Sequence, residues 1–129
     1  MSATEHILVI DDDGDVRDIL VDILRDGGYR VSWAVDGRSM REFLQGGDRV
    51  DAVVLDATLP DEASNSLALH AKELGLPVVM ISGSPDLIQF AAENGLQLLR
   101  KPFRGHELIE AIVQALGSGE PGQRPLTSD

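Results

Sequence analysis

Short apolar runs alternate with segments of helical periodicity along most of this chain, and that alternation limits the possible folds more than any other feature. The apolar runs, each a predicted strand, lie at residues 5–11, 30–35, 51–56, 78–82 and 96–100. Between them, apolar residues recur at the spacing of one helix face. Strands that alternate with helices form a parallel sheet covered on both faces, in which the inner strands are apolar throughout. We predict an α/β fold with a doubly wound, five-stranded parallel sheet and five helices.

Glycine, proline and capping residues mark the ends of the predicted helices. The first helix ends at Gly27-Gly28, and two further helices cover about 38–45 and about 65–74. Ser84-Pro85-Asp86 has the order of an N-cap serine, a first-turn proline and an acid near the positive end of a helix. This order predicts a short helix that runs through about Glu93.

The last predicted helix is amphipathic and is followed by a segment rich in glycine and proline. It carries Leu108, Ile112 and Leu116, and residues 117–129 after it are expected to form a flexible tail. A chain of 129 residues with 43% hydrophobic residues has the size of one ordinary domain. We therefore expect one domain over residues 1–116.

Charge and composition exclude several classes of protein. The net charge of −11 disfavours nucleic-acid binding, which requires lysine and arginine to neutralise phosphates. The absence of cysteine removes disulfides and most structural zinc sites. No apolar stretch approaches the roughly 18 residues of a membrane span, and residues 1–5 do not resemble a signal peptide. We expect a cytoplasmic protein that binds neither membrane nor nucleic acid.

Acidic and polar residues follow four of the predicted strands. Asp11 and Asp12 follow the first, Asp56 ends the third, Ser82 ends the fourth, and Lys101 follows the fifth. Ligands of an open parallel sheet bind beyond the carboxyl ends of its strands, so these side chains are expected to converge. Two carboxylates about 4 Å apart repel by about 4 kcal/mol at an effective dielectric constant of about 20. A hard cation such as Mg²⁺ would offset that repulsion and leave coordination positions open for phosphate oxygens.

The same residues suit phosphoryl transfer. A carboxylate can act as a nucleophile and form an aspartyl phosphate. Lys101 would bring a positive charge to the transferred group, and the Ser82 hydroxyl would donate to one of its oxygens. Asp13, by contrast, is expected to cap the first helix. Helix capping does not explain Asp56, which lies at another strand end forty-five residues beyond Asp11.

With these motifs in order, the chain resembles the receiver domain of bacterial two-component response regulators, in particular the single-domain receivers of the chemotaxis-regulator type. The resemblance covers roughly residues 6–116 through ILVIDDD, VVLDATLP, VVMISG and KPF, which occur in the family's order and at comparable spacing. It implies a flavodoxin-like fold of five βα repeats and a cis bond between Lys101 and Pro102.

The resemblance also implies a role for each matched residue. Asp56 would be the phosphoacceptor, with Lys101 pairing with the phosphoryl group and Ser82 as the switch residue. Mg²⁺ would be held by Asp12 and Asp56 directly, by Asp11 through water, and by the backbone carbonyl of Thr58.

Three departures from the family pattern bear on function. Leu98 stands where receivers usually carry an aromatic residue that swings inward on phosphorylation. The segment between Ser82 and Lys101 is a few residues shorter than usual, so we expect a trimmed fourth helix. After Pro60, the acids Asp61 and Glu62 replace the customary pattern, and we expect them to influence metal affinity or access.

Three alternative functions follow from the same sequence. A flavin-binding module shares the architecture, but Asp11-Asp12-Asp13 would repel the flavin phosphate. A phosphohydrolase with an aspartyl nucleophile would need a second carboxylate two residues further on, where Thr58 stands. A degenerate receiver would bind partners without being phosphorylated, and Leu98 is compatible with it.

The favoured function is a stand-alone receiver. It would take a phosphoryl group from a phosphohistidine on a histidine kinase or a histidine phosphotransfer protein, and then change its affinity for another protein. The downstream target is not encoded in any motif of this chain. We expect no enzymatic activity beyond self-catalysed phosphoryl transfer and autodephosphorylation.

Overall fold

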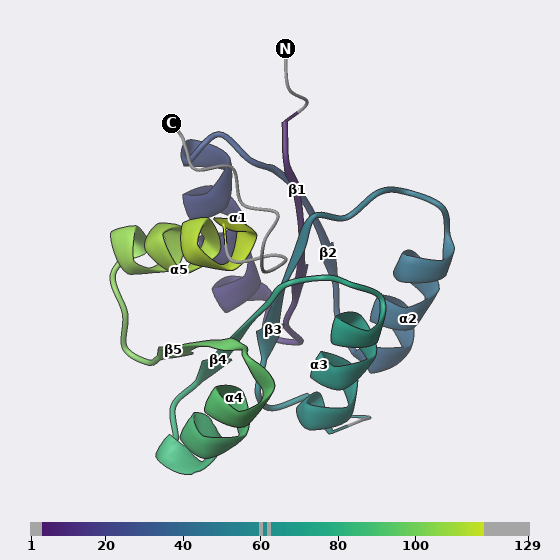
Figure 1. Cartoon of the computed structure of the whole chain (residues 1–129). Coiled ribbons are helices and arrows are strands. Elements are labelled where there is room, and N and C mark those ends of the chain that lie inside the picture. Colours follow the sequence, from purple (N-terminus) through teal and green to yellow (C-terminus); the bar gives the residue numbers. More distant parts are fainter. Residues whose placement is uncertain (1–3, 60, 62, 118–129) are drawn as a thin grey trace.

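The computed structural model describes residues 4–59, 61 and 63–117, and these residues form a parallel sheet with helices on both faces (Figure 1). The sheet has five strands in the order β2-β1-β3-β4-β5. The predicted α/β class, strand count and flavodoxin-like winding are confirmed. Among the described residues, no helix combines the length and the apolar character that a membrane crossing requires.

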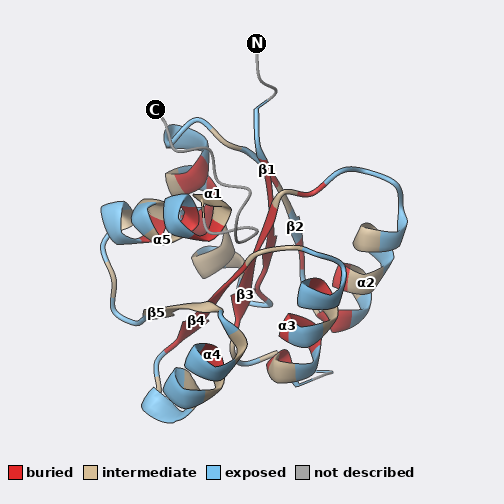
Figure 2. Ribbon diagram, in the orientation of Figure 1, coloured by how far each residue is buried: buried red, intermediate tan, exposed pale blue. Residues whose placement is uncertain are grey.

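The strands lie within one residue of their predicted ends. They are β1 (His6–Ile10), β2 (Arg30–Ala34), β3 (Ala52–Asp56), β4 (Val78–Ser82) and β5 (Gln97–Arg100). Every residue of β1, β3 and β4 is buried, which explains why these strands are apolar without alternation (Figure 2). The edge strand β2 is buried at only two of its five positions.

The helices are α1 (Gly14–Asp26), α2 (Gly37–Gln45), α3 (Ser64–Glu73), α4 (Ile88–Asn94) and α5 (Gly105–Gly117). Asp13 caps α1 as predicted, since its carboxylate accepts hydrogen bonds from the amides of Asp15 and Val16. Ser84 also caps as predicted, but the segment opens as a 3-10 turn, η1 (Pro85–Leu87), and continues as α4. With seven residues, α4 is the shortest α-helix of the described chain.

Helix α5 extends one residue into the segment that the sequence analysis assigned to the tail. Gly117 still belongs to α5, where we expected the tail to begin. Gly117 is half-buried, and a glycine in the last turn of a helix does not by itself end it. The rest of the predicted tail, 118–129, lies outside the described residues.

Two hydrophobic cores lie on opposite faces of the sheet. Ile7 and Val9 of β1 pack with α1 and α5, whereas Leu8 and Ile10 pack against α2, α3 and α4. The alternation of side chains along β1 therefore supplies both cores from one strand. Because the chain leaves β1 toward β2 on one side and returns to β3 on the other, the strand order reverses between β1 and β3. In this fold class a ligand crevice opens at that reversal, beyond the carboxyl ends of the two strands.

The core on the α2 side can be tested at Met40, which is fully buried. We expect Met40→Ala to lower the free energy of unfolding by about 2 to 5 kcal/mol, because it removes buried apolar volume and leaves a cavity. Urea denaturation would measure the change. Glu42→Ala is the control on the same helix, since it breaks only the exposed ion pair with Arg38 and should change stability by less than about 1 kcal/mol. Equal losses in the two variants would contradict this packing.

Candidate functional site

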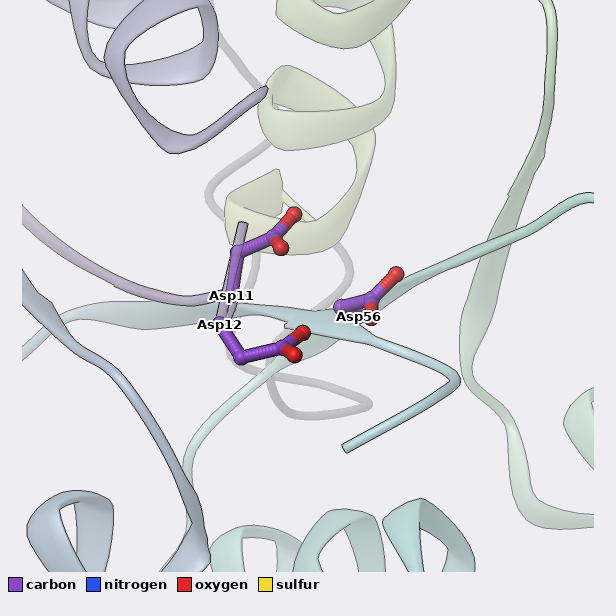
Figure 3. Close-up of side chains that lie close together, drawn as sticks. All are labelled: Asp11, Asp12 and Asp56. Atoms are coloured by element: carbon purple, nitrogen blue, oxygen red, sulfur yellow. The ribbon is translucent and has the colours of Figure 1, made fainter. Parts of the chain in front are cut away.

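Three carboxylates meet at the reversal of strand order. Asp11 and Asp12 follow β1, and Asp56 is the last residue of β3. One oxygen from each of them lies within 4.8 Å of the other two. Figure 3 shows the three side chains close together at neighbouring strand ends. Asp11 and Asp56 are buried, whereas Asp12 is exposed and faces solvent.

Parallel pairing of β1 with β3 brings these residues together. Ile10 pairs with Leu55, and the residue after each of them is an aspartate. Asp11 and Asp56 therefore lie side by side at the same edge of the sheet. The backbone then fixes each buried carboxylate. The Asp13 amide donates to Asp11 Oδ1 at 2.9 Å, and the Thr58 amide donates to Asp56 Oδ2 at 3.2 Å.

Lys101 reaches the site from the end of β5. Its Nζ lies 3.5 Å from Asp56 Oδ1, and its side chain is 40% exposed whereas that of Asp56 is 9% exposed. The Lys101 amide donates to the Ser82 carbonyl, and the bond between Lys101 and Pro102 is cis, as predicted. The ammonium group therefore neutralises part of the acidic cluster and keeps access to solvent.

Ser82 lies next to the cluster but its hydroxyl has local partners. It follows Ile81, the register partner of Asp56, and it is buried. Its Oγ donates to the Ser84 carbonyl and accepts from the Ser84 amide, both at 3.0 Å. The sequence analysis placed Ser82 at the correct strand end and did not foresee this local hydrogen bonding.

Burial dominates the electrostatics of the cluster. It raises the pKa of Asp56, against the opposing effects of the Lys101 ammonium and the Thr58 amide. Burial also raises the pKa of Asp11; the hydrogen bond from Asp13 opposes this shift, and the charge of Asp56 adds to it. Both carboxylates are therefore held in an environment that disfavours their charged forms.

The donor set fits a hard divalent cation. Mg²⁺ prefers oxygen ligands, commonly binds one or two carboxylates directly and keeps several waters. Two buried carboxylates with raised pKa values and one solvent-facing carboxylate offer such a set. Among the described residues, no other group of three acids, histidines or cysteines meets in this way.

The sequence analysis missed two supporting side chains, Ser64 and Arg17, and did not foresee the contacts of a third, Asp61. Ser64, buried at the start of α3, donates from Oγ to the Asp56 carbonyl at 2.7 Å. Arg17 of α1 donates from Nη1 to the Asp11 carbonyl at 3.0 Å. Asp61 accepts from the amides of Gly37 and Arg38. For Arg17, the position one helical turn after Asp13 was a usable signal, whereas nothing in the sequence pointed to the partners of Ser64 and Asp61.

The raised pKa of Asp56 predicts that Asp56→Asn stabilises the metal-free protein at neutral pH. In the wild type, the folded state binds the Asp56 proton more tightly than the unfolded chain, so stability falls as pH rises from about 4 through the raised pKa. The neutral amide removes that penalty and keeps an acceptor for the Thr58 amide. We expect a higher thermal midpoint for the variant at pH 7 without Mg²⁺, and convergence with the wild type as pH falls to about 4. A lower midpoint at pH 7 would show that the contact with Lys101 outweighs burial.

Comparison with curated proteins shows relatives among bacterial regulators. The chain is 36% identical over 110 residues to the uncharacterized transcriptional regulatory protein YbdJ of Bacillus subtilis, a match that covers 81% of this chain and 47% of that protein. It is 38% identical over 117 residues to the transcriptional regulatory protein PrrA of Mycobacterium tuberculosis, covering 86% of this chain and 49% of PrrA. The chain thus spans about half the length of the curated relatives it matches.

Solved structures of receiver proteins match the fold over nearly their whole length. A response regulator receiver protein from Sinorhizobium medicae aligns with a TM-score of 0.80 and 31% identity, covering 91% of this chain and 98% of that one. A CheY-like receiver domain protein from Methanospirillum hungatei aligns with a TM-score of 0.80 and 26% identity, covering 88% of this chain and 94% of that one. The profile of the response regulator receiver domain matches residues 7–113. These matches agree with the acidic cluster found where the strand order reverses. The chain belongs to the response regulator receiver domain family.

Proposed function

We propose that this protein is a phosphoacceptor of a two-component system and that Asp56 takes the phosphoryl group from a phosphohistidine. The donor would be a histidine kinase or a histidine phosphotransfer protein. The observation that carries the proposal is the environment of Asp56, whose carboxylate meets those of Asp11 and Asp12 within 4.8 Å and lies 3.5 Å from Lys101 Nζ. These groups supply a nucleophile, a cation site and a positive charge in one crevice.

The metal ligands in this proposal are those of the acidic cluster. Asp12 and Asp56 would bind Mg²⁺ directly, and Asp11 would bind it through water. The Thr58 carbonyl would be the remaining protein ligand. When bound, Mg²⁺ would neutralise negative charge on the carboxylates and on the incoming phosphoryl oxygens. The hydrogen bond from the Thr58 amide to Asp56 supports a fixed position for that backbone segment.

The protein's own side chains position the transferred group. A carboxylate oxygen of Asp56 forms the new P–O bond as the P–N bond of the phosphohistidine breaks and the imidazole leaves with the electron pair. Lys101, half-exposed beside Asp56, then pairs with a phosphoryl oxygen. The Ser82 hydroxyl donates to another, for which it must rotate away from the Ser84 carbonyl. We propose no catalysed reaction beyond this self-phosphorylation and its hydrolysis.

Signal output is proposed to proceed through protein binding. The net charge of −11 is unsuited to a surface that contacts nucleic acid. Leu98, at the position where receivers usually carry an aromatic residue, packs against the core on the α2, α3 and α4 side. We therefore infer that the phosphorylated state is signalled without a large swing at position 98.

Phosphorylation can be tested with a small phosphodonor. Incubation with acetyl phosphate and Mg²⁺ should add the mass of one phosphoryl group to the wild type and none to Asp56→Asn, as measured by intact-mass spectrometry. Asp15→Asn is the matched control, since it changes an exposed acid of the first turn of α1. Wild-type protein that gains no mass, and shows no spectral change with beryllofluoride, would favour a degenerate receiver that acts by binding alone.

Metal binding can be tested separately through stability. Mg²⁺ should raise the thermal midpoint of the wild type because it binds the folded state, an effect worth about 2.7 kcal/mol at a hundredfold excess over Kd. The shift should be smaller in Asp12→Ala, which removes one of the proposed direct ligands, and unchanged in Asp15→Asn. Equal shifts in the wild type and in Asp12→Ala would remove Asp12 from the ligand set.

A further inference from the structure

The loop after the phosphoacceptor is attached to a neighbouring helix by a carboxylate. Asp61 lies between β3 and α3, and its two oxygens accept from the first two amides of α2, Gly37 at 2.9 Å and Arg38 at 3.1 Å. These contacts join segments more than twenty residues apart in sequence. A carboxylate at this place also meets the positive end of the helix dipole, which favours it.

Helix α2 already has a capping residue of its own. Asp36 is the N-cap, and its carboxylate accepts from the Ser39 amide at 2.8 Å while its carbonyl accepts from the Met40 amide. The Met40 bond is the first helical hydrogen bond of α2. Among the amides before it, Asp36 serves Ser39 through its side chain, and Asp61 serves Gly37 and Arg38. Asp61 therefore adds a long-range contact to a helix end that a local cap has already fixed.

The same loop carries groups that contact the phosphoacceptor. The Thr58 amide donates to the Asp56 carboxylate, and Ser64, at the start of α3, donates to the Asp56 carbonyl. Asp61 stands between these two contacts, three residues after Thr58. Its carboxylate is directed to α2, and the described acids that meet in one cluster are Asp11, Asp12 and Asp56. The sequence analysis expected Asp61 and Glu62 to influence metal affinity or access; Glu62 lies outside the described residues. The contacts of Asp61 with α2 indicate that its influence is mechanical.

We propose that Asp61 is a positioning residue that anchors the loop on α2 and so holds the Thr58 carbonyl ready for Mg²⁺. The inference rests on the proposed function, because it takes the Thr58 carbonyl as a metal ligand. Coupling between two sites is reciprocal, so Mg²⁺ binding also strengthens the contact of Asp61 with the first turn of α2. The start of α2 thereby senses whether the metal site is filled.

Mg²⁺ affinity measured by titration calorimetry tests the anchor. We expect the Kd for Mg²⁺ to rise by about fivefold or more in Asp61→Ala, the lower end of typical coupling between sites. Asp61→Asn, which keeps one strong acceptor, should fall between the wild type and Asp61→Ala. Asp36→Ala is the matched control, because it weakens the same helix end without touching the loop, and it should leave the Kd unchanged.

Amide hydrogen exchange distinguishes the anchor from a residue that only stabilises α2, because only the anchor makes exchange at the start of α2 depend on Mg²⁺. In the wild type, Mg²⁺ should slow exchange of the Gly37 and Arg38 amides, and this metal-dependent protection should be lost in Asp61→Ala. In Asp36→Ala, baseline exchange near Ser39 should be faster, but the response of Gly37 and Arg38 to Mg²⁺ should persist.

The outcomes separate the two ideas. Wild-type protein that binds no Mg²⁺ would overturn the proposed function together with its metal site. Wild-type protein that binds Mg²⁺, with the same Kd in Asp61→Ala, would overturn the anchor alone. An equal loss of affinity in Asp36→Ala and Asp61→Ala would also overturn it, since the effect would then come from the general stability of α2.

Discussion

Parallel pairing of β1 with β3 is the interaction on which the rest of this molecule depends. It places the ends of two strands, forty-five residues apart in sequence, side by side at the point where the strand order reverses. Each strand is buried along its whole length, so the pairing is held by both hydrophobic cores at once. The packing beneath these strand ends holds the backbone of the acids close together, and their carboxylates repel one another.

That repulsion is the physical basis of the proposed site. Burial disfavours the charged forms of Asp11 and Asp56, and Lys101, which contacts Asp56, remains half-exposed. A cluster of this kind lowers the free energy of unfolding of the metal-free protein, and a bound cation raises it again. The affinity for metal and the loss of stability without metal therefore have the same origin. The amides of Asp13 and Thr58 hold the carboxylates of Asp11 and Asp56 in place.

The sequence was sufficient for the fold and for the acidic cluster because both follow from local patterns. Apolar runs located every strand within one residue, and the strand ends identified Asp11, Asp12, Asp56 and Lys101 as neighbours. The β3–α3 loop was less predictable, because α3 starts at Ser64 after Ala63, which forms no side-chain cap. The hydrogen-bond partners of Ser64, Ser82 and Asp61 depend on backbone groups brought close only by the folded chain, and periodicity carries no information about them.

The carboxylates of five acids at and after the ends of β1 and β3 have different partners. Asp13 accepts two backbone amides at the start of α1, both through Oδ1, and Asp61 accepts two at the start of α2, one through each oxygen. Asp11 and Asp56 each accept one amide and keep an oxygen near the shared cluster, and Asp12 faces solvent beside them. Two of the five carboxylates therefore cap helix starts, and the other three meet in the acidic cluster. An acidic stretch such as Asp11-Asp12-Asp13 cannot be divided by composition alone, because the division is made by the turn between β1 and α1.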